Sequence, residues 1–309
     1  MSMRVPSLMN NAQSLLDLQR IKASYAAVSQ QLTTGQAAPN LGDDPSGTAL
    51  VMNYQSSISL NTQYMGQADT ATSQLQSSST VLTTMGSNIS RLLELGQEGL
   101  AGTSSPSSRV AIGSEVDALR SDLIGLGNTQ ASGKYLFAGT KTTTKPFLDN
   151  VPAAGGLPQS VTYQGDAGTV RLDLGTSNSV VTNIPGSTLF FGPGGQGSAT
   201  DLLAQTTALR DALTSNNTAA LQTAYDNLQT INDRINVAMA DLGGRENGVT
   251  QLKDGLSSFN SNLTSIQSSV ASVDYPKAIT QLNQESVAQQ ATLSVMAKSN
   301  QKSLFDYIG

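Results

Sequence analysis

A long apolar repeat runs through the C-terminal half of the sequence. Sixteen positions recur at alternating gaps of three and four residues, and all but Arg245 are apolar. They are Leu221, Ala224, Leu228, Ile231, Ile235, Ala238, Leu242, Arg245, Val249, Leu252, Leu256, Phe259, Leu263, Ile266, Val270 and Val273. This heptad pattern keeps one stripe of a helix against a partner helix. We expect a single helix that continues through Gly243-Gly244 and spans roughly 80 Å at about 1.5 Å per residue.

The partner of this helix is expected upstream, between residues 50 and 92. The same repeat there is held by Leu50, Tyr54, Tyr64, Ala68, Ala71, Leu75, Leu82, Met85, Ile89 and Leu92, with polar interruptions at Ser57, Asn61 and Ser78. A shorter third helix is predicted over 112–126, because apolar residues again recur at gaps of four and three. Two long helices and one short helix predict a bundle.

Residues 138–200 have a different character, since they hold 11 of the 28 glycines and 5 of the 10 prolines. Three short runs in this region resemble strands: Val161–Tyr163, Val170–Leu174 and Leu189–Phe191. We therefore predict a small β-rich inserted domain. The chain enters it from one helix and leaves into another at about Asp201.

Both ends of the chain are predicted to be helical, with sparser apolar seams. A break at Asp274-Tyr275-Pro276 separates the C-terminal helix from the long helix before it. Because neither terminal helix has enough apolar surface to be stable alone, both are expected to order on assembly. The candidate assembly residues are Leu18, Ile21, Tyr25, Val28 and Leu32 near the N-terminus and Leu282, Leu293, Met296 and Leu304 near the C-terminus.

These patterns predict a mainly α fold, in which a long coiled-coil rod is formed by the N- and C-terminal halves and carries the β-rich insertion. The expected segments are an N-terminal polymerisation segment at 1–44, the two halves of the rod at 45–137 and 201–273, the β-rich outward domain at 138–200 and a C-terminal polymerisation helix at 274–309.

The composition argues against most kinds of catalysis. The chain contains no Cys and no His, which excludes mechanisms and metal sites that depend on thiolate or imidazole groups. We predict neither an enzyme nor a cofactor. A net charge of −5 disfavours nucleic acid and anionic membranes as partners. Residues 1–13 lack the features of a secretory signal peptide, and no apolar stretch is long enough for a membrane span.

Two motifs are compatible with a binding site, but each has a simpler structural interpretation. Residues 192–197 read Gly-Pro-Gly-Gly-Gln-Gly and match the dinucleotide-binding fingerprint, yet the βαβ repeat that this fingerprint requires is missing. A flexible exit from the β-rich insertion explains the glycines better. Asp43-Asp44-Pro45 is interpreted as a helix start, with Asp44 as the N-cap and Pro45 at the first helical position.

Local motifs add a resemblance to the flagellin superfamily. Gln30-Gln-Leu-Thr-Thr-Gly35 followed by Gly42-Asp-Asp-Pro-Ser46 is similar to the N-terminal signature of that family. Asp241-Leu-Gly-Gly-Arg-Glu-Asn247 and Asp274-Tyr275 resemble the matching part of its C-terminal half. Gly133-Lys-Tyr-Leu-Phe-Ala-Gly139 and Ser303-Leu-Phe-Asp306 resemble the members at the junction of hook and filament more than filament flagellin.

The resemblance implies a structural role outside the cell, at the flagellar hook–filament junction, reached by type III export without a cleaved signal peptide. The implied partners are hook-associated protein 1, flagellin, further copies of the chain in a ring and a flagellar export chaperone. The alternatives are filament flagellin or, from a different class, an acidic coiled-coil adhesin or a type III needle-tip protein.

Overall fold

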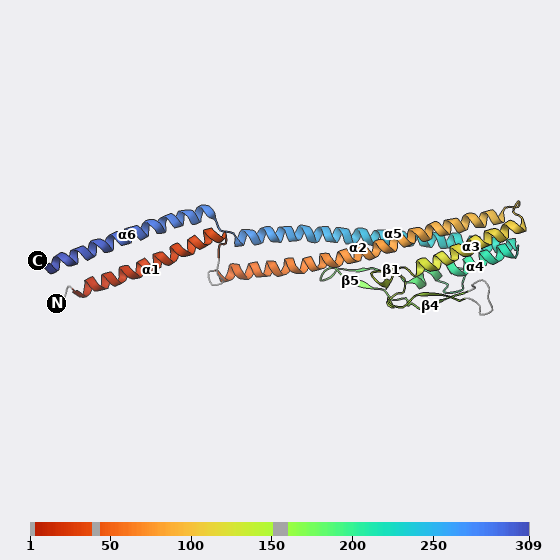
Figure 1. Cartoon of the computed structure of the whole chain (residues 1–309), viewed down its shortest axis with the longest axis horizontal. Coiled ribbons are helices and arrows are strands. Elements are labelled where there is room, and N and C mark those ends of the chain that lie inside the picture. Colours follow the sequence, from red (N-terminus) through yellow and green to blue (C-terminus); the bar gives the residue numbers. More distant parts are fainter. Residues whose placement is uncertain (1–3, 39–43, 151–159, 309) are drawn as a thin grey trace. The chain divides into compact units, whose positions relative to one another are not determined.

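The computed structural model describes the backbone of residues 4–38, 44–150 and 160–308, and the side chains within these ranges from residue 12 to residue 298. The chain divides into two compact units. Unit 1 contains residues 1–60 and 258–309, and unit 2 contains residues 61–257. Two long helices, α2 (Pro45–Leu100) and α5 (Thr218–Ala271), contribute residues to both units. The expected mainly α fold class with a β-rich insertion is confirmed (Figure 1).

The core of unit 2 lies along the predicted seams of α2 and α5. On α5, Leu221, Leu228 and Ile235 are at most 1% exposed, and α5 continues through Gly243-Gly244 as expected. The predicted third helix is α3 (Pro106–Gly127). A short turn after Thr214 separates a fourth helix, α4 (Leu202–Thr214), from α5. This helix was not predicted as a separate element.

The prediction of one unbroken seam along α5 was wrong toward the C-terminal end of that helix. In unit 1 the side chains of Phe259 and Ile266 are 54% and 45% exposed, so neither lies in a closed core. The amide of Gln267 donates to Gln55 Oε1 at 3.0 Å, which places this part of α5 level with the polar Ser57 of α2. The heptad repeat continues along α5, but α2 lacks matching apolar side chains there.

The helices begin at residues that supply hydrogen-bond acceptors to free backbone amides. Asp44 Oδ1 accepts from the Gly47 amide at 3.0 Å and α2 begins at Pro45, which confirms the predicted N-cap. Hydrogen bonds from the Gly47 amide and the Ser46 hydroxyl lower the pKa of the Asp44 carboxyl. Asp201 caps α4 in the same way through the amides of the second and third helical residues.

The inserted region consists of three antiparallel strand pairs. β1 (Gln130–Ala131) pairs with β2 (Lys134–Tyr135), β3 (Phe147–Asn150) with β4 (Ser160–Tyr163), and β5 (Arg171–Asp173) with β6 (Ser179–Val181). The first pair precedes residue 138, where the insertion was expected to begin. The strand-like runs predicted around Thr162 and Leu172 are confirmed as β4 and β5.

The third strand-like run was predicted wrongly, because residues Ser187–Phe191 form η1, a single turn of π-helix. Leu189, Phe190 and Phe191 are all at most 4% exposed. A strand would direct Phe190 to the opposite face from its neighbours, whereas in the helical turn all three side chains join one apolar core. Phe190 lies against Phe147 with ring centroids 4.3 Å apart, and this contact joins η1 to β3.

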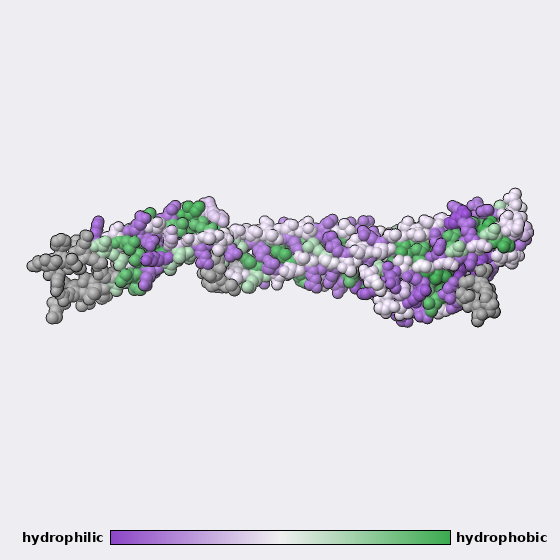
Figure 2. Space-filling view, in the orientation of Figure 1, coloured by the Kyte–Doolittle hydropathy of each residue, from purple (hydrophilic) through white to green (hydrophobic). Residues whose placement is uncertain are grey.

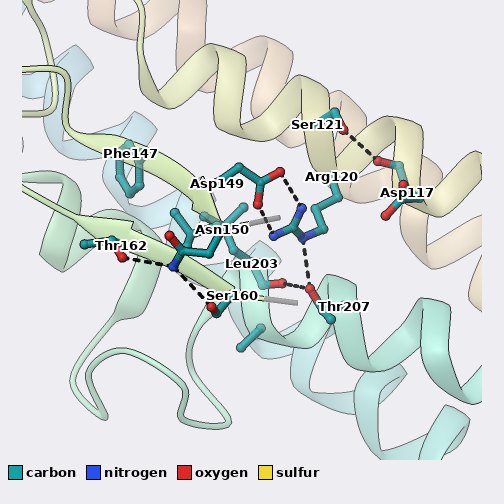
Figure 3. Close-up of polar contacts among 12 residues, drawn as sticks. Asp117, Arg120, Ser121, Phe147, Asp149, Asn150, Ser160, Thr162, Leu203 and Thr207 are labelled. Carbon is teal, nitrogen blue, oxygen red and sulfur yellow. Dashed lines mark hydrogen bonds and ion pairs between the residues drawn. The ribbon is translucent and has the colours of Figure 1, made fainter. Parts of the chain in front are cut away.

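Two arginine side chains, the buried Arg120 and the partly buried Arg245, attach the inserted region to the helices. Arg120 on α3 is fully buried and forms two parallel hydrogen bonds to the Asp149 carboxylate of β3, at 2.8 and 3.1 Å (Figure 3). Its Nε donates to Thr207 Oγ1 of α4 at 2.9 Å. Arg245 of α5 donates to the backbone carbonyls of Val181 and Asn183, both at 3.2 Å. One residue type therefore connects α3, α4 and α5 to the insertion.

Candidate functional site: the terminal helices

The two terminal helices pack against each other in unit 1. α1 (Arg4–Thr34) and α6 (Tyr275–Ile308) lie side by side (Figure 1). Leu18 and Val28 of α1 and Ala278 of α6 are the fully buried apolar side chains among the described residues of these two helices. The contact is therefore narrow, as the sparse apolar pattern predicts.

The nine predicted assembly residues divide into four groups. Leu18 and Val28 are buried, and Ile21, Leu32, Leu282 and Met296 are partly buried. Tyr25 and Leu293 are 37% and 47% exposed, so the pairing of α1 with α6 leaves them open. The side chain of Leu304 lies outside the described part of the structure. Most of the predicted seam is thus occupied by contacts within this chain.

A second set of apolar side chains on the same helices is exposed and was not predicted. Figure 2 shows apolar surface among polar side chains on this part of the molecule. The set consists of Leu15 and Leu16 on α1 and Ile279, Val287 and Val295 on α6, with exposed fractions between 49% and 65%. Leu15 and Leu16 lie off the α1 repeat formed by Leu18, Ile21, Tyr25, Val28 and Leu32. The pairing of α1 with α6 leaves all five side chains exposed.

Backbone hydrogen bonds join the connection after α1 to the connection before α6. The Ala37 amide donates to the Ala271 carbonyl at 2.8 Å, and the Val273 amide donates to the Gly35 carbonyl at 3.0 Å. Gly35 has a φ of +71°, and a Cβ built on it would lie 3.0 Å from the Tyr275 hydroxyl. A side chain at this position would therefore be strained and crowded. These contacts fix the ends of α1 and α6 next to each other.

Charged groups contribute little to the contact between the terminal helices. The Ser24 hydroxyl donates to Glu285 Oε1 at 2.7 Å across the pair, and Arg20 lies 3.5 Å from Asp17 on the exposed side of α1. In the described ranges, no cluster of three or more His, Cys, Asp or Glu residues could hold a metal ion. No described helix has an apolar stretch long enough to cross a membrane. This surface is suited to packing against protein.

The glycine-rich loop at 192–197 has a local structural role. Gly192, Gly195 and Gly197 have φ values between +65° and +78°, which favour glycine over other residues. The Gly197 amide donates to Asp201 Oδ2 at 2.7 Å, so the loop leads directly into the cap of α4. The strands before it form antiparallel hairpins, whereas a dinucleotide fingerprint requires a parallel βαβ unit.

Comparisons with known proteins find the same protein family in the N-terminal part and in the C-terminal part of the chain. Residues 5–142 match the bacterial flagellin N-terminal helical region, and residues 225–308 match the bacterial flagellin C-terminal helical region. Flagellar hook-associated protein 3 of Escherichia coli strain K12 is 26% identical over 319 residues, covering 98% of this chain and 99% of that protein. The protein of the same name from Salmonella typhimurium is 24% identical over the same shares.

A solved structure shows the same fold. The flagellar junction protein FlgL from Legionella pneumophila aligns with a TM-score of 0.58 at 15% identity, covering 74% of this chain and 100% of that one. The N-terminal flagellin region includes β1 and β2, and the other four described strands lie between the two regions, which together cover most of the sequence. The chain belongs to the flagellin superfamily.

Proposed function

We propose that this chain is the structural subunit that joins the flagellar hook to the flagellin filament and is required for motility. The observation that carries the proposal is its similarity to flagellar hook-associated protein 3 over nearly the whole of both chains. That similarity favours the junction role over filament flagellin, an adhesin or a needle-tip protein. The role is structural, without catalysis or a cofactor.

The proposed partners are hook-associated protein 1 on the hook side, flagellin on the filament side, further copies of this chain in a ring and an export chaperone before assembly. The proposed location is extracellular, after export without cleavage of a signal peptide. The narrow contact between α1 and α6 supports assembly with partners, because the exposed Leu16 and Val287 would gain burial only when another molecule packs against them.

In this arrangement the nine predicted residues have two tasks. Leu18, Ile21, Val28, Leu32, Leu282 and Met296 hold α1 and α6 together. Tyr25 and Leu293, with the exposed set Leu15, Leu16, Ile279, Val287 and Val295, contact neighbouring subunits. Leu304 is assigned to the same contacts from its place in the sequence. A charge at the exposed set should therefore block assembly and leave the fold of the subunit intact.

The test is Leu16→Asp, introduced by complementation into a strain that lacks its own junction protein. Leu16 is 56% exposed, so the purified variant should retain the wild-type circular dichroism spectrum. It should be exported to the medium, yet be absent from flagella and fail to restore swimming. Leu18→Asp is expected to block incorporation too, but it also disturbs the contact of α1 with α6.

The matched control is Val237→Asp, which puts the same charge on a 70% exposed apolar side chain of α5 in unit 2. It should be incorporated and restore swimming. Normal swimming with Leu16→Asp would contradict the assignment of α1 to assembly. Immunogold labelling separates the junction role from the filament role, since label along the whole filament would identify the chain as a flagellin.

A further inference from the structure

Six glycines in the described helices of unit 2 have no packing reason, because a Cβ built on any of them would meet no atom within 4 Å and none has a positive φ. They are Gly66 on α2, Gly125 on α3, and Gly243, Gly244, Gly248 and Gly255 on α5. Gly66 and Gly255 are the two of these that lie at one level of α2 and α5. By contrast, a Cβ on Gly99 of α2 would lie 2.4 Å from a Leu213 methyl carbon, so close packing accounts for glycine at that position. Glycine in a helix interior is less favourable than alanine. Both helices are therefore weakened at these positions.

The two weak positions lie at the same level of the helix pair. The Lys253 ammonium group pairs with Asp69 Oδ1 at 2.5 Å, which fixes the register of the antiparallel α2 and α5. Gly66 precedes Asp69 by about one turn, and Gly255 follows Lys253 on the other helix. Because the helices run in opposite directions, the two glycines face the same cross-section of the pair.

The fully buried apolar side chains of α2 nearest to this level, Ala68 and Ala71, are small, and the larger Tyr64 and Met65 beside them are only partly buried. Gln67 Oε1 is buried and accepts no hydrogen bond from any described residue, an arrangement that carries a free-energy cost. The large buried side chains of α2 begin further on, at Leu75. Side-chain packing thus does little to offset the weakness of the backbone.

We propose that Gly66 and Gly255 form a joint, at which α2 and α5 yield together. Since the two glycines lie at the same cross-section of the helix pair, bending α2 at Gly66 costs the least free energy when α5 bends at Gly255. The joint lies just inside the ends of unit 2, at Asn61 and Ser257. It is a conformational device of the helix pair and does not depend on the function proposed above.

Hydrogen exchange of the full-length chain, followed by mass spectrometry, tests the joint. After correction for intrinsic rates, amides at 66–70 of α2 and 255–259 of α5 should exchange faster than amides at 75–82 and 228–242 of the same helices. Gly66→Ala should slow exchange at the joint roughly fivefold, the change expected for glycine against alanine in a helix. The slowing should extend to α5, although the substitution is in α2.

Gly86→Ala is the matched control, because it makes the same change in α2 at another level. A Cβ there meets only Met239 Cε at 3.7 Å, an ordinary contact, and exchange at 66–70 and 255–259 should stay unchanged. Two results would overturn the proposal. One is exchange at the joint no faster than in the flanking segments, and the other is an effect of Gly66→Ala confined to α2.

Discussion

Removing the carboxylate of Asp149 should destabilise unit 2 more than removing its partner arginine. The Arg120 side chain is 1% exposed, whereas the Asp149 side chain is 26% exposed. Asp149→Ala therefore leaves a guanidinium group buried without its anion, while Arg120→Met leaves a carboxylate that water reaches. The two halves of this ion pair are expected to respond unequally.

The magnitudes follow from this asymmetry. Breaking a buried ion pair from one side costs about 3–5 kcal/mol, and we expect Asp149→Ala near the lower end because Arg120 keeps its hydrogen bond to Thr207. Arg120→Met should cost about 1–2 kcal/mol, since methionine replaces the buried stem and the carboxylate regains water. The double variant should be more stable than Asp149→Ala alone, because no charge is left buried without a partner.

Urea unfolding followed by circular dichroism gives the free energy of unfolding of each variant. Thr207→Val is a useful control, because it removes one acceptor of the guanidinium group and leaves the carboxylate in place. The reasoning fails if Arg120→Met costs as much as Asp149→Ala. It also fails if the cost of the double variant equals the sum of the single costs, since the two groups would then be energetically independent.

Two further perturbations probe the inserted region. Gly127→Ala places a Cβ 2.7 Å from the Phe147 ring and should lower the free energy of unfolding by about 1–3 kcal/mol, whereas Gly125→Ala, with open space around it, should be neutral or slightly stabilising. Hydrogen bonds from the Thr140 hydroxyl and amide lower the pKa of the Asp166 carboxyl. The stability that this carboxylate contributes is present above its unfolded pKa near 3.8 and is lost as pH falls through the lower folded pKa. The free energies of unfolding of the wild type and Asp166→Asn should therefore differ above about pH 4 and converge as the pH falls below it.

The helices could be predicted because apolar spacing reports directly on which face of a helix is buried. Leu228 and Leu242 are fully buried where the repeat places them, and α5 passes through the double glycine as its unbroken phase indicates. Arg245 was visible as the polar exception in the repeat, and its ion pair with Asp241 at 2.6 Å follows the helical spacing of four residues. Its partners in the inserted region could not be predicted, because they are backbone carbonyls, and a carbonyl group is the same whichever residue carries it.

The remaining errors have a common physical origin, since each depends on what a segment packs against. Phe259 has the spacing of a core residue, but its exposure is decided by the polar side chains of the partner helix. Leu189–Phe191 has the composition of a strand, but it forms a helical turn whose three side chains join the core shared by the helices and the insertion. The exposed Leu16 and Val287 were not predicted, because the candidate assembly residues were those on the apolar seams of α1 and α6.

The uneven distribution of buried side chains suits a subunit that must fold before it assembles. Unit 2 closes its core with leucine, isoleucine and phenylalanine side chains, and its fully buried Arg120 is paired with Asp149 inside the unit. Leu18 and Val28, the large side chains buried between α1 and α6, contribute about 3–6 kcal/mol together when fully removed from water. A more apolar contact would stabilise α1 and α6 in the free subunit, but it would use the side chains that neighbouring subunits need. In the proposed junction role, the exposed Leu16 and Val287 would keep part of the burial free energy for assembly, and a neighbouring subunit would add to the stability of the terminal helices.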